Sequence, residues 1–365
     1  MENMNEKTQL LGFTPEELAA FFKAQGQPAF RAKQVFAWLH QGVPFEKMSN
    51  LPKALRETLA ENCLDNPVQV IETIRSKLDG TIKLLYKLHD GHIIEGVLMR
   101  YKYGNTLCVS TQVGCRMGCK FCASTLDGCA RSLTPGEILG QIVCANGVLA
   151  QQDEAGQKVG NIVLMGSGEP FDNYDNVVKF LRILRMEGGL CIGMRSVSLS
   201  TCGLVPNMRR FAEENLPLTL TISLHAPNDE IRQQTMPIAK VYKMDEVLDA
   251  CRYYIEKTGR RVVFEYTMVH GVNAGPEHAA ELASRLRGMQ CHVNLIPLNE
   301  VKERSLKSVN EREIDVFKKE LEKRNISVTR RREMGDDIEG ACGQLRRRYM
   351  QEGQTIGSDA EDGHR

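Results

Sequence analysis

Three cysteines within eight residues constrain this chain more than any other feature of its sequence. They are Cys115, Cys119 and Cys122, in the run CRMGCKFC. A structural zinc site needs four ligands, usually as two Cys-x2-Cys pairs. No second pair is present, and the next cysteine downstream is Cys129. Three thiolates that leave one position open suit a 4Fe–4S cluster, whose unique iron can bind another ligand. The run therefore predicts an iron–sulfur centre, with zinc or three unligated thiols as the alternatives.

From Leu107 onward, short apolar strands alternate with helical patterns. The predicted strands are 107–110, 161–165, 196–200, 218–223, 262–268 and 292–296, and the helices between them include 176–186, 244–257 and 276–287. Such repeats favour an α/β fold whose parallel sheet forms an open or partial (βα)6 barrel. Active sites of these folds gather at the carboxyl ends of the strands. Polar motifs do follow the strands, namely GSGEP at 166–170, TCG at 201–203, HAP at 225–227 and PLN at 297–299.

The rest of the chain divides around this alternating region. Residues 1–65 predict a small N-terminal helical accessory domain, with a helix start at Thr14 and Pro15. Residues 66–105 predict a short antiparallel β extension, broken by Asp–Gly turns. The core is assigned to 106–300, a C-terminal extension to 301–350, and a Gly- and acid-rich tail, expected to be disordered, to 351–365. Within the extension we expect a helix after Asn310 and a strand around 326–329.

Composition limits the partners and the cellular setting. Lys and Arg number 47 against 46 acidic residues, so any nucleic-acid surface must be a local patch. No apolar run is long enough to span a bilayer, and the first residues lack the pattern of a signal peptide. Twelve cysteines without the spacing of a secreted scaffold favour the reducing cytoplasm. Those expected to be small buried hydrophobes are Cys63, Cys144, Cys191, Cys202, Cys251 and Cys291.

The cysteine run, with an aromatic residue before its last cysteine, is the signature of radical S-adenosylmethionine (SAM) enzymes. Further motifs are FRAKQVFAW at 30–38, LCVSTQVGC at 107–115, MGSGEP at 165–170, STCG at 200–203, SLHAPND at 223–229, NLIPLN at 294–299 and GDDIEGACGQL at 335–345. With them the chain resembles the RlmN-type dual-specificity RNA methyltransferases, whose relatives are the Cfr-type resistance methyltransferases. The resemblance implies a radical-SAM barrel, a 4Fe–4S cluster on the three cysteines, and two SAM molecules per turnover.

By the same resemblance, a set of residues at the strand ends contacts SAM. They are Gly168, Glu169, Ser200, Ser223, Leu224, His225 and Asn299. The residue chemistry agrees for two of them, because a glycine loop lets the backbone approach a ligand and Glu169 can accept from an ammonium group. Taken alone, a histidine such as His225 is more often structural than a ligand contact, and its place after a strand makes the two explanations equally good.

Cys342 is the second predicted chemical centre. It lies in a GACG loop between the basic triplets 330–332 and 346–348. Nearby cations make a thiol more nucleophilic and favour phosphates, whereas a buried cysteine among solvated arginines is the plain alternative. In the family that the chain resembles, the matching cysteine accepts a methyl group from one SAM. The radical from a second SAM removes a hydrogen from that methyl, and the methylene radical adds to an adenine ring.

The resemblance also implies how the protein–RNA adduct is resolved. Glu95 takes the place of the carboxylate that removes the ring proton, and Cys108 that of the cysteine that attacks Cys342 and forms a disulfide. The motif 168–170 resembles the carbon-2 group, whereas the segment after Asn299 lacks a Pro- and Gly-rich insert of many carbon-2 enzymes. We therefore expect methylation at carbon 2 of a flipped adenosine in 23S rRNA, and in tRNA next to the anticodon. Methylation at carbon 8 is the alternative.

Other activities stay open on the residues alone. A methylthiotransferase would need a second set of three cysteines, and no such set stands out. A glycyl-radical activase and a non-enzymatic zinc- and RNA-binding protein are the remaining alternatives. The expected partners are 23S rRNA, tRNA and a flavodoxin-like or other one-electron donor. We expect a cytoplasmic monomer without membrane association.

Overall fold

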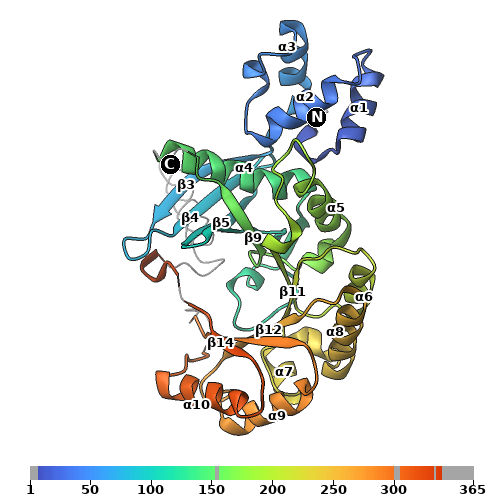
Figure 1. The fold of residues 1–365 in the computed structure, drawn as a ribbon. Helices are drawn as coiled ribbons and strands as arrows, with labels where there is room; N and C mark the ends of the chain where they lie inside the picture. Colours follow the sequence, from blue (N-terminus) through green and yellow to red (C-terminus); the bar gives the residue numbers. More distant parts are fainter. Residues whose placement is uncertain (1–6, 153–155, 300–304, 333, 339–365) are drawn as a thin grey trace, which may run out of the picture.

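The structure, a computed structural model, describes residues 7–152, 156–299, 305–332 and 334–338. Within them the chain is built around one ten-stranded sheet of order β14-β13-β12-β11-β10-β9-β6-β5-β4-β3 (Figure 1). The parallel strands are β6 (Gly104–Cys108), β9 (Val159–Leu164), β10 (Val197–Thr201), β11 (Thr219–Ser223), β12 (Val262–Met268), β13 (Cys291–Pro297) and β14 (Val328–Arg330). The antiparallel strands are β3 (Val68–Arg75), β4 (Ile82–Leu88) and β5 (Ile93–Tyr101).

The predicted fold class is confirmed. Every predicted strand and helix of the alternating region is present, with ends displaced by a few residues. The antiparallel extension is continuous with the parallel sheet, because β5 pairs along its length with β6. The strand expected around 326–329 is β14, which pairs with β13 and forms one edge of the sheet. The division of the chain into five segments stays a prediction.

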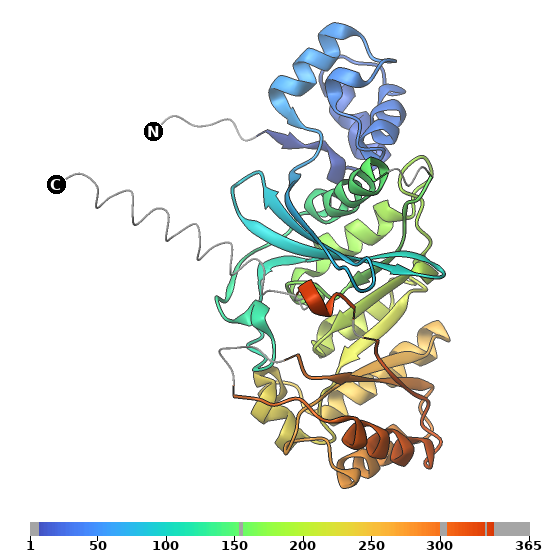
Figure 2. The same ribbon diagram turned by 90° about the vertical axis from the view of Figure 1, so that its left-hand side faces the viewer.

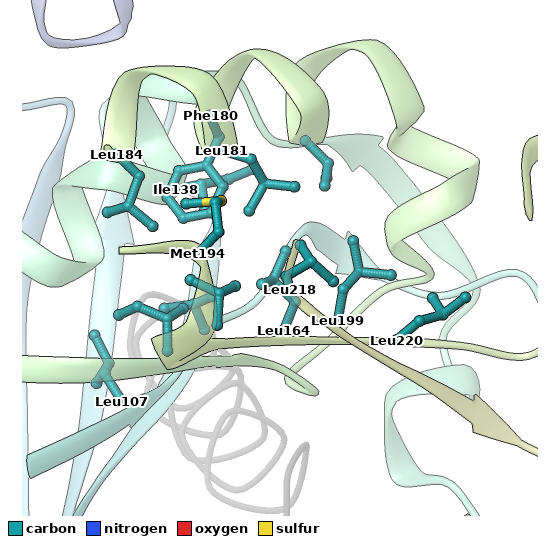
Figure 3. Packing of buried hydrophobic residues seen from close by; sticks show 14 of the residues in the cluster. Leu107, Ile138, Leu164, Phe180, Leu181, Leu184, Met194, Leu199, Leu218 and Leu220 are labelled. Carbon is teal, nitrogen blue, oxygen red and sulfur yellow. The ribbon is translucent and has the colours of Figure 1, made fainter. Parts of the chain in front are cut away.

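Helices cover one face of the sheet and leave the other face open (Figures 1 and 2). The covering helices are α4 (Pro135–Gln151), α5 (Tyr174–Leu184), α6 (Val205–Ala212), α8 (Met244–Thr258), α9 (Pro276–Leu286) and α10 (Glu311–Glu322). Figure 3 shows Ile138 of α4 and Phe180 of α5 packed over the strand residues Leu107, Leu164 and Leu199. Because successive strand residues point to opposite faces, the neighbours of these leucines point to the open face. No helix in the described ranges is long and apolar enough to cross a membrane.

The N-terminal helices form a separate cluster beside the sheet (Figure 1). They are α1 (Pro15–Ala24), α2 (Arg31–His40) and α3 (Lys53–Asn62). The helix start predicted at Thr14 is a capping box, in which Thr14 Oγ1 accepts from the Glu17 N–H and the Glu17 carboxylate accepts from the Thr14 N–H. The cluster meets the core where Gly12 lies on the start of α4. A Cβ on Gly12 would be only 2.7 Å from the backbone nitrogen of Gly136, so this approach requires glycine.

The expectation for the lone cysteines holds only in part. Cys63 and Cys251 are buried as predicted, and Cys144 and Cys291 are half-buried. The prediction is wrong for Cys191, which is exposed because it lies in the loop after α5, outside the core. Cys202 is buried, but it lines the cavity described below and is more than a packing residue.

The glycine contact gives a matched pair of stability predictions. Gly12→Ala should lower the free energy of unfolding by about 1–3 kcal/mol, because its new methyl group collides with backbone that has no room to move. Gly147→Ala, in the middle of α4 with open space at its Cβ, should raise it by about 0.5–1 kcal/mol. Urea unfolding followed by circular dichroism measures both. Equal changes in the free energy of unfolding for the two variants would contradict the close approach of Gly12 to Gly136.

Candidate active site at the carboxyl ends of the parallel strands

A cavity of about 220 Å³ lies at the carboxyl ends of the parallel strands. Many of the residues predicted from sequence line it, namely Cys115, Cys119, Cys122, Gly168, Glu169, Ser200, Ser223 and His225. It is also lined by residues that were not predicted, including Met165, Cys202, Met236, Glu265 and Arg331. The loops that follow the strands therefore converge as the fold class requires.

The three clustered cysteines lie in the loop between β7 (Gln112–Gly114) and β8 (Cys129–Ser132). Burial raises the pKa of the Cys115 thiol to about 12 and also raises that of Cys119. Buried thiols of this kind ionise only where a cation offsets the charge. In the described ranges, no three His, Cys, Asp or Glu side chains converge on a single ion position. Three thiols from one loop leave the fourth position of a 4Fe–4S cluster open to another ligand. The donor set thus fits a 4Fe–4S cluster.

The loop after β9 presents Glu169 to the cavity. Gly168 has φ of +112°, and a Cβ there would lie 2.7 Å from the Gln112 nitrogen, so glycine is required. The Glu169 N–H donates to Gln112 Oε1 (2.9 Å), and the two carboxylate oxygens accept from the N–H groups of Phe171 (3.0 Å) and Cys202 (2.8 Å). Burial raises the pKa of Glu169, and these hydrogen bonds oppose the rise. The carboxylate is therefore fixed in place and suited to a cationic ligand group.

His225 follows β11 in a left-handed conformation, with φ of +55°. Its Nδ1 accepts from the Thr267 N–H at 2.9 Å, so the neutral ring carries its proton on Nε2. Burial lowers its pKa to about 3, and the nearby Arg232 cation contributes in the same direction. The edge of the ring contacts Phe121, next to Cys122, with centroids 4.7 Å apart. His225 is thus a neutral hydrogen-bond donor beside the cysteine loop.

Strand register carries a row of polar side chains across the open face. Ser200 Oγ and Ser223 Oγ are 3.2 Å apart. Ser223 is paired with Glu265 on β12, and Glu265 with Asn294 on β13. The Asn294 amide donates to Glu265 Oε1 at 3.1 Å, and Thr329 Oγ1 on β14 donates to Asn294 Oδ1 at 2.8 Å. Paired residues share a face of a sheet, and Ser200, Ser223 and Glu265 of this row line the cavity.

Glu95 and Cys108 lie on the same open face, although neither lines the cavity. Cys108 is paired with Val97, two residues from Glu95 on β5, and also with Val163 on β9. Glu95 forms a buried ion pair with Lys83 of β4, with Nζ and Oε2 3.4 Å apart. Cys108 packs in one apolar cluster with Met165, which does line the cavity.

The segment after β14 returns across the open face to the opposite edge of the sheet. The Gly335 N–H donates to Asp79 Oδ2 at 2.9 Å, and the Lys77 N–H donates to Asp337 Oδ2 at 2.8 Å. Both contacts are with the turn between β3 and β4, where Figures 1 and 2 show the short helix at 336–338 against the sheet. Met334 packs in the apolar cluster of Cys108. Cys342, predicted as the methyl carrier, lies outside the described residues.

Two predicted SAM contacts are not part of the cavity lining. Leu224 is fully buried. Its N–H donates to the Glu265 carbonyl (3.2 Å), and its own carbonyl accepts from Arg232 Nε (3.2 Å). Asn299 follows β13 and is exposed. Sequence reasoning missed Glu265 and Arg331. A lone acid inside the apolar run VVFEYTM was the one available signal for Glu265, and Arg331 had only its place in a basic triplet.

The comparisons with known proteins agree across the chain. Residues 109–283 match the Radical SAM superfamily, and residues 8–64 match the N-terminal domain of ribosomal RNA large subunit methyltransferases. A protein from Clostridium tetani named probable dual-specificity RNA methyltransferase RlmN is 53% identical, over 93% of this chain and 96% of its own length. A protein of the same name from Alkaliphilus oremlandii is 52% identical, over 95% and 99%.

A solved structure has the same fold. The crystal structure of a radical SAM methyltransferase from Sphaerobacter thermophilus superposes with a TM-score of 0.89 and is 42% identical. The match covers 92% of this chain and 98% of that one.

The set of cluster ligands can be tested by exchanging single cysteines. Cys119→Ala should abolish binding of the cluster, whereas the wild-type chain should hold about four irons. Cys129→Ala is the control, because Cys129 lies on β8 near the loop but does not line the cavity. Iron and sulfide per chain after anaerobic reconstitution are the measurements. Loss of iron from the control, or full iron in Cys119→Ala, would contradict the assignment.

Proposed function

This chain belongs to the RlmN family of radical SAM RNA methyltransferases, and from that premise we propose that it methylates carbon 2 of an adenosine in 23S rRNA. The proposal extends to a tRNA adenosine next to the anticodon, to a monomeric protein and to a flavodoxin-like or other one-electron donor. The family makes the chain an RNA methyltransferase that uses SAM and a 4Fe–4S cluster. The cavity that joins the cysteine loop to Glu169 and His225 is the observation that carries the proposal.

The electronic character of the target carbon determines which roles the residues must fill. Carbon 2 lies between two ring nitrogens and is too electron-poor to attack a sulfonium. When bound, the cluster and SAM supply the one-electron chemistry that makes a carbon radical and takes back the surplus electron. Cys119 and its two partner cysteines would hold the cluster, and Glu169 would accept from the SAM ammonium group. Cys342 would carry the methyl group as S-methylcysteine and present its carbon to the ring.

Glu95 and Cys108 would complete the reaction after the new carbon–carbon bond forms. Glu95 would take the proton from carbon 2, and its ion pair with Lys83 fixes the position of the carboxylate. The Cys108 thiolate would then attack the Cys342 sulfur. The bond between that sulfur and the transferred carbon breaks, its electron pair stays on the carbon, and a proton completes the methyl group. The placement of both residues on the open face of the sheet supports these roles.

The C-terminal segment supports a meeting of Cys342 with Cys108. Met334 contacts the apolar cluster of Cys108, and the hydrogen bonds to Asp79 and Lys77 hold residues 335–337 at the sheet. Cys342 follows Ile338 by four residues, which reach at most about 14 Å. This chain length supports the proposal that the Cys342 thiol reaches the face that carries Glu95 and Cys108.

The position of the methyl group can be read from nucleosides. Expression in a host that lacks its own enzyme should yield 2-methyladenosine in rRNA and tRNA, detected by mass spectrometry of digested RNA. Cys342→Ala should abolish the product while the protein keeps its iron. Only 8-methyladenosine would move the chain to the carbon-8 group. No methylated adenosine from an iron-loaded wild-type protein would overturn the substrate assignment.

Resolution of the adduct gives a separate prediction. Cys108→Ala should stop turnover after addition, because no second thiol can attack the Cys342 sulfur. A covalent protein–RNA adduct should then accumulate on a denaturing gel, and nuclease digestion should leave an adenosine mass on the peptide of Cys342. Cys251→Ala, a buried cysteine of α8, is the matched control and should release free RNA. Free, fully methylated RNA from Cys108→Ala would exclude its role.

A further inference from the structure

Glu265 is a buried carboxylate with one oxygen unused. The residue is 4% exposed and lies on β12 at the floor of the cavity. Oε1 accepts from the Asn294 amide at 3.1 Å, whereas Oε2 has no hydrogen-bond partner among the residues that the structure describes. Nη1 of Arg331 lies 4.0 Å from Oε2, beyond hydrogen-bond distance. Buried polar atoms are nearly always satisfied, so an unsatisfied oxygen on a residue that lines a cavity points to a ligand.

The carboxylate is held as a preformed acceptor. Thr329 fixes the Asn294 amide by donating to its oxygen, and His292 Nε2 lies 2.9 Å from the Thr329 hydroxyl. This chain of contacts crosses three neighbouring strands, so the side chain of Glu265 cannot turn away without breaking it. Burial raises the pKa of Glu265, and the Arg331 cation opposes that rise. A carboxylate that is held rigidly although its burial costs hydration free energy is typical of a binding site.

The surroundings decide which kind of ligand group fits. Ser223 is the register neighbour of Glu265 on β11, with Ser200 beside it, so three oxygen-bearing side chains share one stretch of floor. The cysteine loop and Glu169 line other parts of the same cavity. A carboxylate flanked by hydroxyls recognises neutral donors, such as hydroxyl and amino groups, and repels phosphates. Adenosine offers both donors, and it occurs in SAM and in the RNA target of the family.

We propose that Glu265 is a ligand-binding residue whose Oε2 accepts a hydrogen bond from a hydroxyl or amino group of an adenosine moiety bound in the cavity. The inference rests on the RNA methyltransferase activity of the family and does not depend on which ring carbon is methylated. Arg331 follows β14, and its guanidinium, 4.0 Å from the unused oxygen, favours the charged form of the carboxylate.

Glu265→Gln tests the proposal because it reverses polarity without changing size. The Asn294 amide donates toward residue 265, so the glutamine oxygen must stay on that side. The amide nitrogen of the glutamine then takes the place of Oε2. It can only donate a hydrogen bond, whereas the proposed ligand group needs an acceptor. Losing a hydrogen bond to a charged acceptor should weaken binding about tenfold or more. Glu281→Gln, a carboxylate of α9 that does not line the cavity, is the matched control and should bind as wild type.

Two binding measurements separate the sources of the adenosine. The dissociation constant for SAM is measured by calorimetry on the cluster-loaded protein without RNA, and that for an RNA stem-loop by fluorescence anisotropy. A rise for SAM alone assigns the contact to the cofactor, and a rise for RNA alone assigns it to the target. Values within twofold of wild type for both ligands would overturn the proposal. Because no turnover is needed, the result is independent of the methylated product.

A second variant keeps the test decisive if Glu265→Gln loses its cluster or unfolds. Glu265→Asp keeps the charge and withdraws the carboxylate by one methylene. It should keep the wild-type iron content and thermal midpoint, and still lose affinity for one of the two ligands. Wild-type affinity for both ligands in this variant would equally reject Glu265 as a contact.

Discussion

The site depends on one buried cation, the guanidinium of Arg232 on α7 (Asp229–Thr235). It is fully buried, and it donates to the Cys202 carbonyl at 2.6 Å and to the Leu224 carbonyl at 3.2 Å. It therefore joins the loops that follow β10 and β11. The Cys202 N–H in turn holds Glu169. A buried cation is unfavourable unless negative charge lies close by, and the thiol of Cys119 is within its electrostatic reach. Thiolates bound to iron would supply that charge, so the loops and a bound cluster would stabilise each other.

The two faces of the sheet have opposite chemistry because of the period of a β-strand. On β13, Val293 and Leu295 are buried under the helices, whereas Asn294 between them points to the open face. The same alternation places Leu107 in the core and Cys108 on the open face. A shift of register by one residue would exchange the two sets, so the apolar packing against the helices also fixes the reactive side chains that lie on the strands. Stability and chemistry thus share one determinant.

The sequence predicted what is encoded locally. The alternation of strands and helices lies within short windows, and that prediction is confirmed. The spacing of Cys115, Cys119 and Cys122 is equally local; the three cysteines line one cavity, and their role as cluster ligands stays a prediction. Contacts that depend on the pairing of distant strands could not be predicted from the sequence. Glu265 resembled a lone acid in a strand until β13 brought Asn294 beside it, and no local pattern shows that Lys83 on β4 reaches Glu95 on β5. The exposure of Cys191 was missed for the same reason, since apolar neighbours in sequence do not report burial in space.

The return of the chain from β14 to the turn between β3 and β4 has a mechanical consequence. These elements lie toward opposite ends of the strand order, yet only four peptide steps separate Arg331, hydrogen-bonded to β13, from Gly335, hydrogen-bonded to Asp79. Four extended residues span about 14 Å, which sets an upper limit on how far the two ends of the sheet can separate. The segment therefore limits how far the curved sheet can open. To separate the two ends of the sheet beyond this limit, the contacts to Asp79 and Lys77 must be released, and residues 334–338 must move away from the turn between β3 and β4.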